Sequence, residues 1–328
     1  MNIVHIIGNG FDLNLGLKTS YKHFYEYYKK QESKNDNIKL LKKEIDTNTE
    51  NWSDLELALG KFTSEITTVE EFEIIRQDII LNLSNYLKSI ESSFDLSNVN
   101  THELSIFLSS PHIELRNGDK AIFEELLISL KHEMSSINII SFNYTSILDN
   151  LIQNFVDKTM SFAKAISSNS TIKPVKHIHG LLDERLIIGV NDNSQVSNEN
   201  FTKEIDFNEA FIKTEYNKAS GHLVDDECVD LINNANIICV FGSSLGLTDM
   251  FWWELICNKL LKQNCKLIIY HKSFNVEGAL FDNLITKEIR ILKEKFLSNK
   301  SNLTNEEKEI IRQNIYVNVN SNFFNILN

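Results

Sequence analysis

Two short segments contain side chains with the chemistry of catalytic groups. Segment 177–180 is His-Ile-His-Gly, and segment 141–145 is Ser-Phe-Asn-Tyr-Thr with Asn143 at its centre. Alternate residues of a strand share one face, so His177 and His179 could chelate a metal ion together. One imidazole could instead act as a base or hold a ribose hydroxyl, with Gly180 making room for the ligand. The chain offers no companion His or Asp cluster to complete a metal site, so we expect no metal, and a purely structural role for either histidine stays open.

Asn143 follows an apolar run and precedes a helix-like segment at residues 147–155. An asparagine in this position can cap the N-terminus of the helix. Alternatively, it can face a ligand, because the carboxyl ends of parallel strands form the binding crevice of open α/β sheets. The sequence is compatible with both interpretations.

A glycine-rich loop follows the first apolar run of the chain, at residues 3–7. Paired glycines between a strand and a helix let backbone N–H groups approach a phosphate, since a Cβ atom would hold the ligand away. Leu13 stands where the third glycine of G-x-G-x-x-G should be, so a plain tight turn is an equally good interpretation. The candidate ligand contacts of this region are Gly8, Asn9, Gly10, Phe11, Asp12, Gly16, Thr19, Ser20 and Tyr21.

A second turn of small residues follows the apolar segment 236–241 and precedes an aromatic helix start. Its backbone amides and hydroxyls, at Gly242, Ser243 and Ser244, could hold ribose or phosphate. Asp249 is a further candidate contact, although it could equally cap the following helix. The same residues match Gly-x-Ser-x-Gly, but a hydrolase of that type needs a later histidine, and only His271 follows.

The elements that position these motifs alternate between strands and helices. Several of the expected strands are continuous and β-branched, as in strands that are covered on both faces. This pattern predicts an α/β fold with a mostly parallel sheet and helices on both faces. The expected strands are residues 2–7, 137–142, 173–178, 185–190, 236–241, 266–271 and 314–319.

One long region has helical periodicity and no convincing strand. We therefore predict that residues 31–133 form an all-helical module inserted after the first strand, and that residues 1–30 and 134–328 form the α/β domain. The apolar helices of this module and the aromatic pair Trp252-Trp253 could supply an interface for a homo-oligomer.

Composition narrows the class of protein. The chain has 328 residues, 42% of them hydrophobic, and a net charge of −12, which argues against nucleic acid or an anionic membrane as the main partner. No apolar run approaches a membrane helix, and no secretory signal is visible. The four cysteines form no C-x-x-C pair, so we expect reduced, mostly buried thiols in a cytoplasmic protein.

The order of the motifs is more specific than any one of them. The glycine loop, Trp52-Ser53-Asp54-Leu55-Glu56, segment 141–145, segment 177–180 and segment 242–246 together resemble the AbiH family of bacteriophage abortive-infection proteins. The resemblance extends from the first strand to about Trp253. It implies an antiviral defence effector in bacteria, with a phage-derived trigger among its possible partners.

The same order looks like a divergent sirtuin-type, Rossmann-like fold that binds NAD⁺. This resemblance implies that Gly8 and Gly10 match the phosphate loop, that Asn143 and His179 match the catalytic pair, and that Gly242 and Ser244 lie at the adenosine side. Tyr144-Thr145 stand where a sirtuin has Ile-Asp, and the zinc-ribbon cysteines are absent. The implied activity is therefore cleavage of NAD⁺, the substrate, at the nicotinamide–ribose bond. A nucleotide-binding sensor without turnover and a metal-dependent hydrolase using both histidines are the alternatives.

Overall fold

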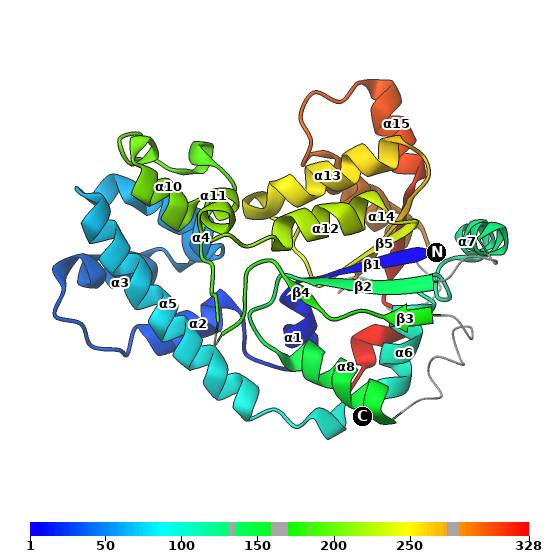
Figure 1. The fold of residues 1–328 in the computed structure, drawn as a ribbon, viewed down its shortest axis with the longest axis horizontal. Helices are drawn as coiled ribbons and strands as arrows, with labels where there is room; N and C mark the ends of the chain where they lie inside the picture. Colours follow the sequence, from blue (N-terminus) through cyan, green and yellow to red (C-terminus); the bar gives the residue numbers. More distant parts are fainter. Residues whose placement is uncertain (131–134, 159–169, 183, 274–281, 328) are drawn as a thin grey trace.

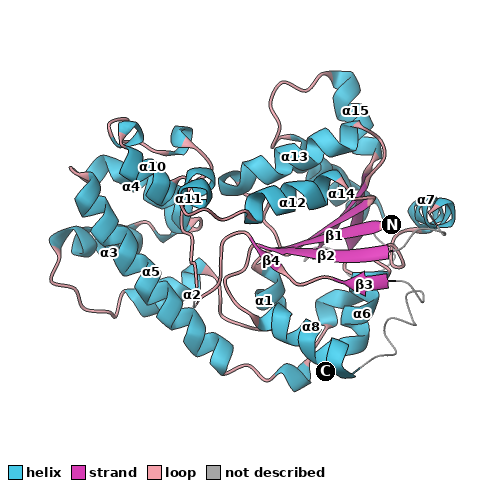
Figure 2. Cartoon of the chain, in the orientation of Figure 1, coloured by secondary structure: helices cyan, strands magenta, loops and turns pink. Residues whose placement is uncertain are grey.

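Seven parallel strands form one sheet at the centre of the protein (Figures 1 and 2). The computed structural model describes residues 1–130, 135–158, 170–182, 184–273 and 282–327. Within these residues the sheet order is β3-β2-β1-β5-β6-β7, and β4 pairs with β2. The strands are β1 (Asn2–Ile7), β2 (Ser135–Ser141), β3 (Ser170–Ile172), β4 (Lys176–His177), β5 (Ile237–Phe241), β6 (Lys266–His271) and β7 (Ile315–Val319). The predicted α/β class with a mostly parallel sheet is confirmed.

One predicted strand, at residues 185–190, is wrong, and the strand predicted at residues 173–178 is reduced to the two residues of β4. The only bridge in segment 185–190 is an isolated one between Val190 and Ile212. Ile188 and Val190 are nevertheless fully buried, because the segment passes through a packed group of helices. Its backbone bonds to partners outside the sheet. The Gly189 N–H donates to a carboxylate oxygen of Glu56 over 3.1 Å, and the Val190 N–H donates to the Phe211 carbonyl over 2.9 Å. The apolar run belongs to a buried loop and not to the sheet.

Helices cover both faces of the sheet, as predicted. Ile3 and Ile137 belong to the core on one face, and Val4 and Ile238 belong to the core on the other. The first face is covered by α1 (Gly10–Asn14), α6 (Thr101–Ser109), α7 (Asn117–Ser129) and α8 (Ile147–Lys158). The second face is covered by α12 (Val224–Asn233), α13 (Met250–Leu261), α14 (Asp282–Leu297) and α15 (Asn305–Gln313).

The other helices in the described part of the chain pack together beside the carboxyl ends of the strands (Figure 1). We call them the helical lobe. Its longest helix, α5, begins with a capping box between Thr68 and Glu71, and its apolar residues recur three and four positions apart, which buries one stripe. The helices of the lobe are α2 (Tyr21–Tyr28), α3 (Asp36–Thr47), α4 (Leu55–Phe62), α5 (Val69–Ser92), α10 (Ile205–Phe211) and, packed against α10, α11 (Lys213–Ala219).

The packing divides the module predicted for residues 31–133. Within residues 31–130 the regular elements are α-helices and 3-10 turns. However, α3–α5 belong to the helical lobe, whereas α6 and α7 lie against the sheet. Residues 131–133 lie outside the described residues, and the domain boundaries stay a prediction.

Two further expectations concern surfaces. Trp252 and Trp253 belong to α13, and both side chains are buried in the core between this helix and the sheet. The prediction that this pair supplies an interface is therefore wrong. All four cysteines are buried and free. In the part of the chain that the structure describes, no helix is both long enough and apolar enough to span a bilayer.

Candidate active site

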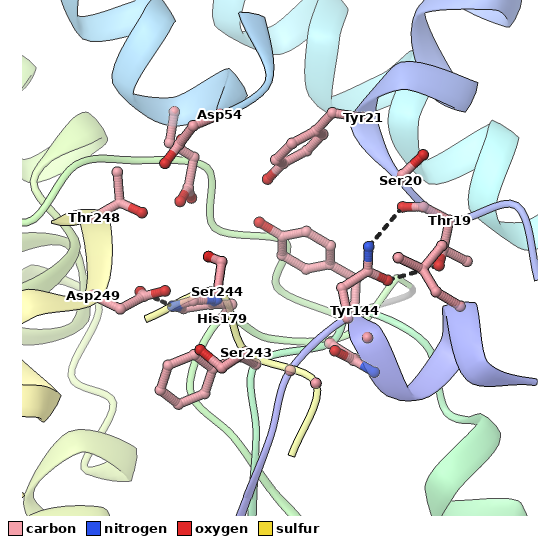
Figure 3. Close-up of a pocket in the computed structure, with 18 of the residues that line it drawn as sticks. Thr19, Ser20, Tyr21, Asp54, Tyr144, His179, Ser243, Ser244, Thr248 and Asp249 are labelled. Atoms are coloured by element: carbon pink, nitrogen blue, oxygen red, sulfur yellow. Dashed lines mark hydrogen bonds and ion pairs between the residues drawn. The ribbon is translucent and has the colours of Figure 1, made fainter. Parts of the chain in front are cut away.

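A cavity of about 450 Å³ lies at the carboxyl ends of β1, β2 and β5 (Figure 3). The chain places β2 on one side of β1 and β5 on the other, so the cavity occupies the switch point where ligands bind in open α/β sheets. Loops of the sheet form one wall. Tyr21, Asp54, Leu83 and Leu87 of the helical lobe and its flanking turns form the opposite wall.

Most of the predicted site residues meet at this cavity, although they come from motifs far apart in the sequence. Both candidate catalytic residues are among them, and each is almost fully buried. The predicted residues that line the cavity are Gly8, Asn9, Gly10, Thr19, Ser20, Tyr21, Asn143, His179, Gly242, Ser243, Ser244 and Asp249.

The glycines join the two loops that follow β1 and β5. A Cβ atom on Gly10 would lie 2.5 Å from the Cα of Gly242, and one on Gly8 would lie 2.7 Å from the Gly242 carbonyl oxygen. Gly242 itself has a φ of +70°. The N–H groups of Gly8 and Gly10 donate to the carbonyls of Phe241 and Gly242 over 2.9 and 2.8 Å. Close packing of the two loops therefore explains why glycine is needed here, and these two amides are already paired.

Asn9 ties the glycine loop to the segment that leads into α2. Its Oδ1 accepts the Thr19 hydroxyl over 2.7 Å, and its Nδ2 donates to the Thr19 carbonyl over 3.1 Å (Figure 3). Ser20 then begins the helix, because its hydroxyl oxygen accepts the backbone N–H of His23. The hydrogen bonds of Asn9 and the helix cap at Ser20 thus fix the segment that contains Thr19 and Ser20 beside the glycine loop.

Asn143 is held by Asp12 and is not a helix cap, because α8 begins four residues later at Ile147. The Asn143 Nδ2 donates to Asp12 over 3.0 Å, and Thr145 donates its hydroxyl to the same carboxylate over 2.7 Å. Burial raises the pKa of Asp12 to about 6, although both hydrogen bonds act in the opposite direction. The Oδ1 of Asn143 is buried and has no hydrogen-bond partner among the described residues.

His177 and His179 have different surroundings in the structure. His177 lies outside the cavity wall, where its Nδ1 donates to the Asn143 carbonyl over 3.1 Å and its Nε2 lies 2.9 Å from Asp149. Gly180, with a φ of +77°, forms a turn directly after His179. A Cβ atom there would overlap the Arg185 carbonyl, so this glycine makes room for backbone and not for a ligand.

His179 faces the cavity and pairs with Asp249 (Figure 3). Its Nε2 lies 3.0 Å from the Asp249 Oδ1, although the N–H direction is not aligned as in a good hydrogen bond. Asp249 stands at the N-cap position of α13, yet its side chain makes no capping bond. A carboxylate that orients an imidazole is a recurrent arrangement for general bases.

A buried lysine completes this group of charges. The Nζ of Lys213 lies 2.8 Å from Asp249 Oδ1 and 2.8 Å from Glu56 Oε2. Burial alone would raise the pKa of Asp249, but Lys213 and His179 outweigh it and hold that pKa well below its usual range. Burial alone would lower the pKa of Lys213, but the two carboxylates raise it, so the lysine stays charged.

Several residues of the site were missed by the sequence interpretation. Asp54 and Glu56 belong to segment 52–56, which supports the family resemblance but was not interpreted as part of a site. Tyr21, which was predicted, and Tyr144, which was not, both point their hydroxyls into the cavity (Figure 3). Burial raises the pKa of both phenols well above the ordinary value, so they stay neutral. No local pattern marks Lys213, whose partners are distant in the chain.

Four predicted contacts lie outside the cavity wall, and each has another role. Phe11 is fully buried against Phe241 and Phe323. Gly16, with a φ of +76°, forms the turn after α1. Asp12 and His177 do not reach the cavity but each forms a hydrogen bond with Asn143. In the described residues, no three His, Cys, Asp or Glu side chains are grouped as a metal site.

Comparison with known proteins agrees with this arrangement of motifs. A search of curated proteins gave no match. The family model described as bacteriophage abortive infection AbiH matches residues 4–271, a stretch that includes every wall of the cavity. Because the match covers most of the chain, the protein belongs to the AbiH family and has a role in abortive-infection defence against phage.

Proposed function

We propose that the cavity binds NAD⁺ and hydrolyses its nicotinamide–ribose bond during phage infection. The observation that carries this proposal is that Asn143 and His179, which follow different strands, line one cavity at the switch point of the sheet. Both side chains are more than nine-tenths buried, so water enters this part of the site only in restricted positions.

The charges of the cavity favour a cationic transition state. Cleavage of a glycosidic bond passes through an oxocarbenium-like sugar. Asp54, Glu56 and Asp249 line the cavity, and Lys213 is the cation paired with two of them. The resulting negative potential stabilises positive charge that develops on the ribose.

The residues divide the reaction between them. His179, oriented by Asp249, takes a proton from water while the water oxygen bonds to the ribose carbon and nicotinamide leaves with the electron pair of the broken C–N bond. The unpaired Oδ1 of Asn143 accepts a hydrogen bond from a ribose hydroxyl or from that water.

The phosphates need other donors than the amides of Gly8 and Gly10, which are paired within the protein. Ser243 and Ser244 supply them. The Ser243 oxygen accepts the N–H of Leu245 over 3.0 Å, and its own hydroxyl proton remains for a ligand.

The test is to follow nicotinamide release from NAD⁺ by the purified protein, with and without phage extract, and to compare Asn143→Ala and His179→Ala. A positioned base contributes about 10²–10⁴ to the rate, so His179→Ala should nearly abolish release and phage protection. Absence of release under every condition, with unchanged protection in both variants, would refute the proposal. Binding of NAD⁺ without release would favour a sensor, and loss of activity on metal chelation would favour a metal-dependent hydrolase.

A further inference from the structure

Lys213 joins the helical lobe to the loops of the sheet. It begins α11, its side chain is 10% exposed, and its Nζ contacts Glu56 of α4 and Asp249 beside α13. A third contact, to the Thr248 carbonyl, measures 3.2 Å. An ammonium group has three protons, so these contacts use every donor of the lysine.

One oxygen atom of Asp249 lies between the lysine and the histidine. Its Oδ1 is 2.8 Å from Lys213 Nζ and 3.0 Å from His179 Nε2. An ionised carboxylate can only accept hydrogen bonds, and a ring nitrogen with a lone pair would be repelled by it at this distance. Although its N–H direction is not well aligned, the Nε2 that faces Asp249 at this distance therefore has to bear a proton.

We propose that Lys213 is a positioning residue that keeps Asp249 ionised and in place, so that the imidazole proton of His179 resides on Nε2 and Nδ1 keeps its lone pair. The lysine does not touch the ligand in this role. It selects which nitrogen of His179 is available as a base. The proposal rests on the proposed function only for the use of that base.

The other groups around His179 explain why a cation is needed. Asp249, Glu56 of α4 and Asp225 of α12 all act on it electrostatically. Its ring also contacts the rings of Phe142 and Tyr144, at centroid distances of 5.1 and 6.3 Å. Without Lys213, Asp249 would face Glu56 with no cation between them and would turn away, so the proton of His179 would no longer be fixed on Nε2.

The experiment is nitrogen NMR on the ligand-free full chain with ¹⁵N-labelled histidine. The signals of His179 are assigned by their absence from His179→Asn. We expect the wild type to show a single tautomer of His179, with its proton on Nε2, and Lys213→Met to lose this signature. Lys259→Met is the matched control, because Lys259 is also buried but donates to the Asn233 carbonyl between α12 and α13, outside the cavity wall. A wild-type tautomer in Lys213→Met, or the same loss in Lys259→Met, would overturn the proposal.

Lys213→Met leaves two buried carboxylates without their cation, and removing one partner of a buried ion pair strongly destabilises proteins. The double variant Glu56→Gln/Lys213→Met removes one of these charges and is the second arm, with the same expected loss of signature. Nicotinamide release is measured in parallel. If the tautomer changes as expected and the wild type never releases nicotinamide, the proposed function fails and the role of Lys213 stands. If nicotinamide is released and the tautomer does not change in Lys213→Met, the role proposed for Lys213 fails and the proposed function stands.

Discussion

The side-chain amide of Asn143 donates to the carboxylate of Asp12 over 3.0 Å, and this bond determines which end of the amide is free. Nδ2 is used by Asp12, so the unpaired Oδ1 is the end left for a ligand. Asp12 lies in α1, directly after the glycine loop, and Asn143 follows β2. The N-terminal loop thus orients a cavity residue although Asp12 itself lies outside the cavity wall.

Asp12→Asn should make the stability less dependent on pH in the acid range. The folded pKa of Asp12 is about 6, above the ordinary 3.8, so the folded state binds more protons between these values. The wild type should lose about 3 kcal/mol in total relative to the variant, most of it as the pH rises from 3.8 to 6. Urea unfolding at a series of pH values measures this, and parallel curves for the two proteins would contradict it.

His5→Gln should reveal the opposite dependence. His5 is fully buried in β1, and burial lowers its pKa from 6.5 to about 4, although the hydrogen bond to the Leu108 carbonyl acts the other way. The unfolded state therefore binds more protons in this range, and the wild type should lose about 3 kcal/mol relative to the variant as the pH falls from 6.5 to 4. The effects of Asp12 and His5 oppose each other between pH 4 and 6, so single variants are required. An equal difference in stability at pH 7.5 and pH 4.5 would argue against the buried neutral imidazole.

Gly10→Ala should destabilise the fold by about 1–3 kcal/mol, because the new methyl group would collide with the backbone of Gly242 and neither loop can move freely. Gly118→Ala is the matched control. Gly118 lies in α7 with no atom within 4 Å of its added Cβ, so the change should be neutral or stabilise by up to about 1 kcal/mol. Thermal unfolding of both variants measures the difference, and equal midpoints would show that the loops tolerate a side chain.

Asp249→Asn should reduce nicotinamide release by about 10²–10⁴, because the amide no longer stabilises a protonated His179. Asp149→Asn offers the comparison, since Asp149 pairs with His177 over a similar distance but outside the cavity wall. We expect its effect to be at least tenfold smaller. Initial rates at saturating NAD⁺ separate the two variants, and equal losses would assign the effect to folding and not to the base.

The parts of the fold that follow local rules could be predicted from the sequence. β1 and β6 have the predicted bounds, because continuous β-branched runs bounded by turn residues identify strands buried on both faces. Segment 185–190 has the same composition and is a loop, since burial by helices leaves the same apolar signal as burial in a sheet. An apolar composition therefore indicates that a segment is buried, but it does not indicate whether a sheet or a group of helices buries it.

The residues of the site could also be predicted from the sequence only in part. Motifs at strand ends identified Asn143 and His179, because topology brings such ends together. The contact between Lys213 and Glu56 joins residues 157 positions apart, and no local spacing encodes it. Gly8, Gly10 and Gly242 do line the cavity, but the physical reason for glycine there is loop packing, which depends on a neighbouring strand distant in the chain.

The joined loops after β1 and β5 have a consequence for synthesis on the ribosome. A nascent chain that has not yet reached β5 has no Gly242 for Gly8 and Gly10 to pack against, and it also lacks Ser243, Ser244 and Asp249. Prematurely terminated products shorter than about three quarters of the length therefore cannot contain the pocket, and any activity that resides in it is restricted to chains that are nearly finished.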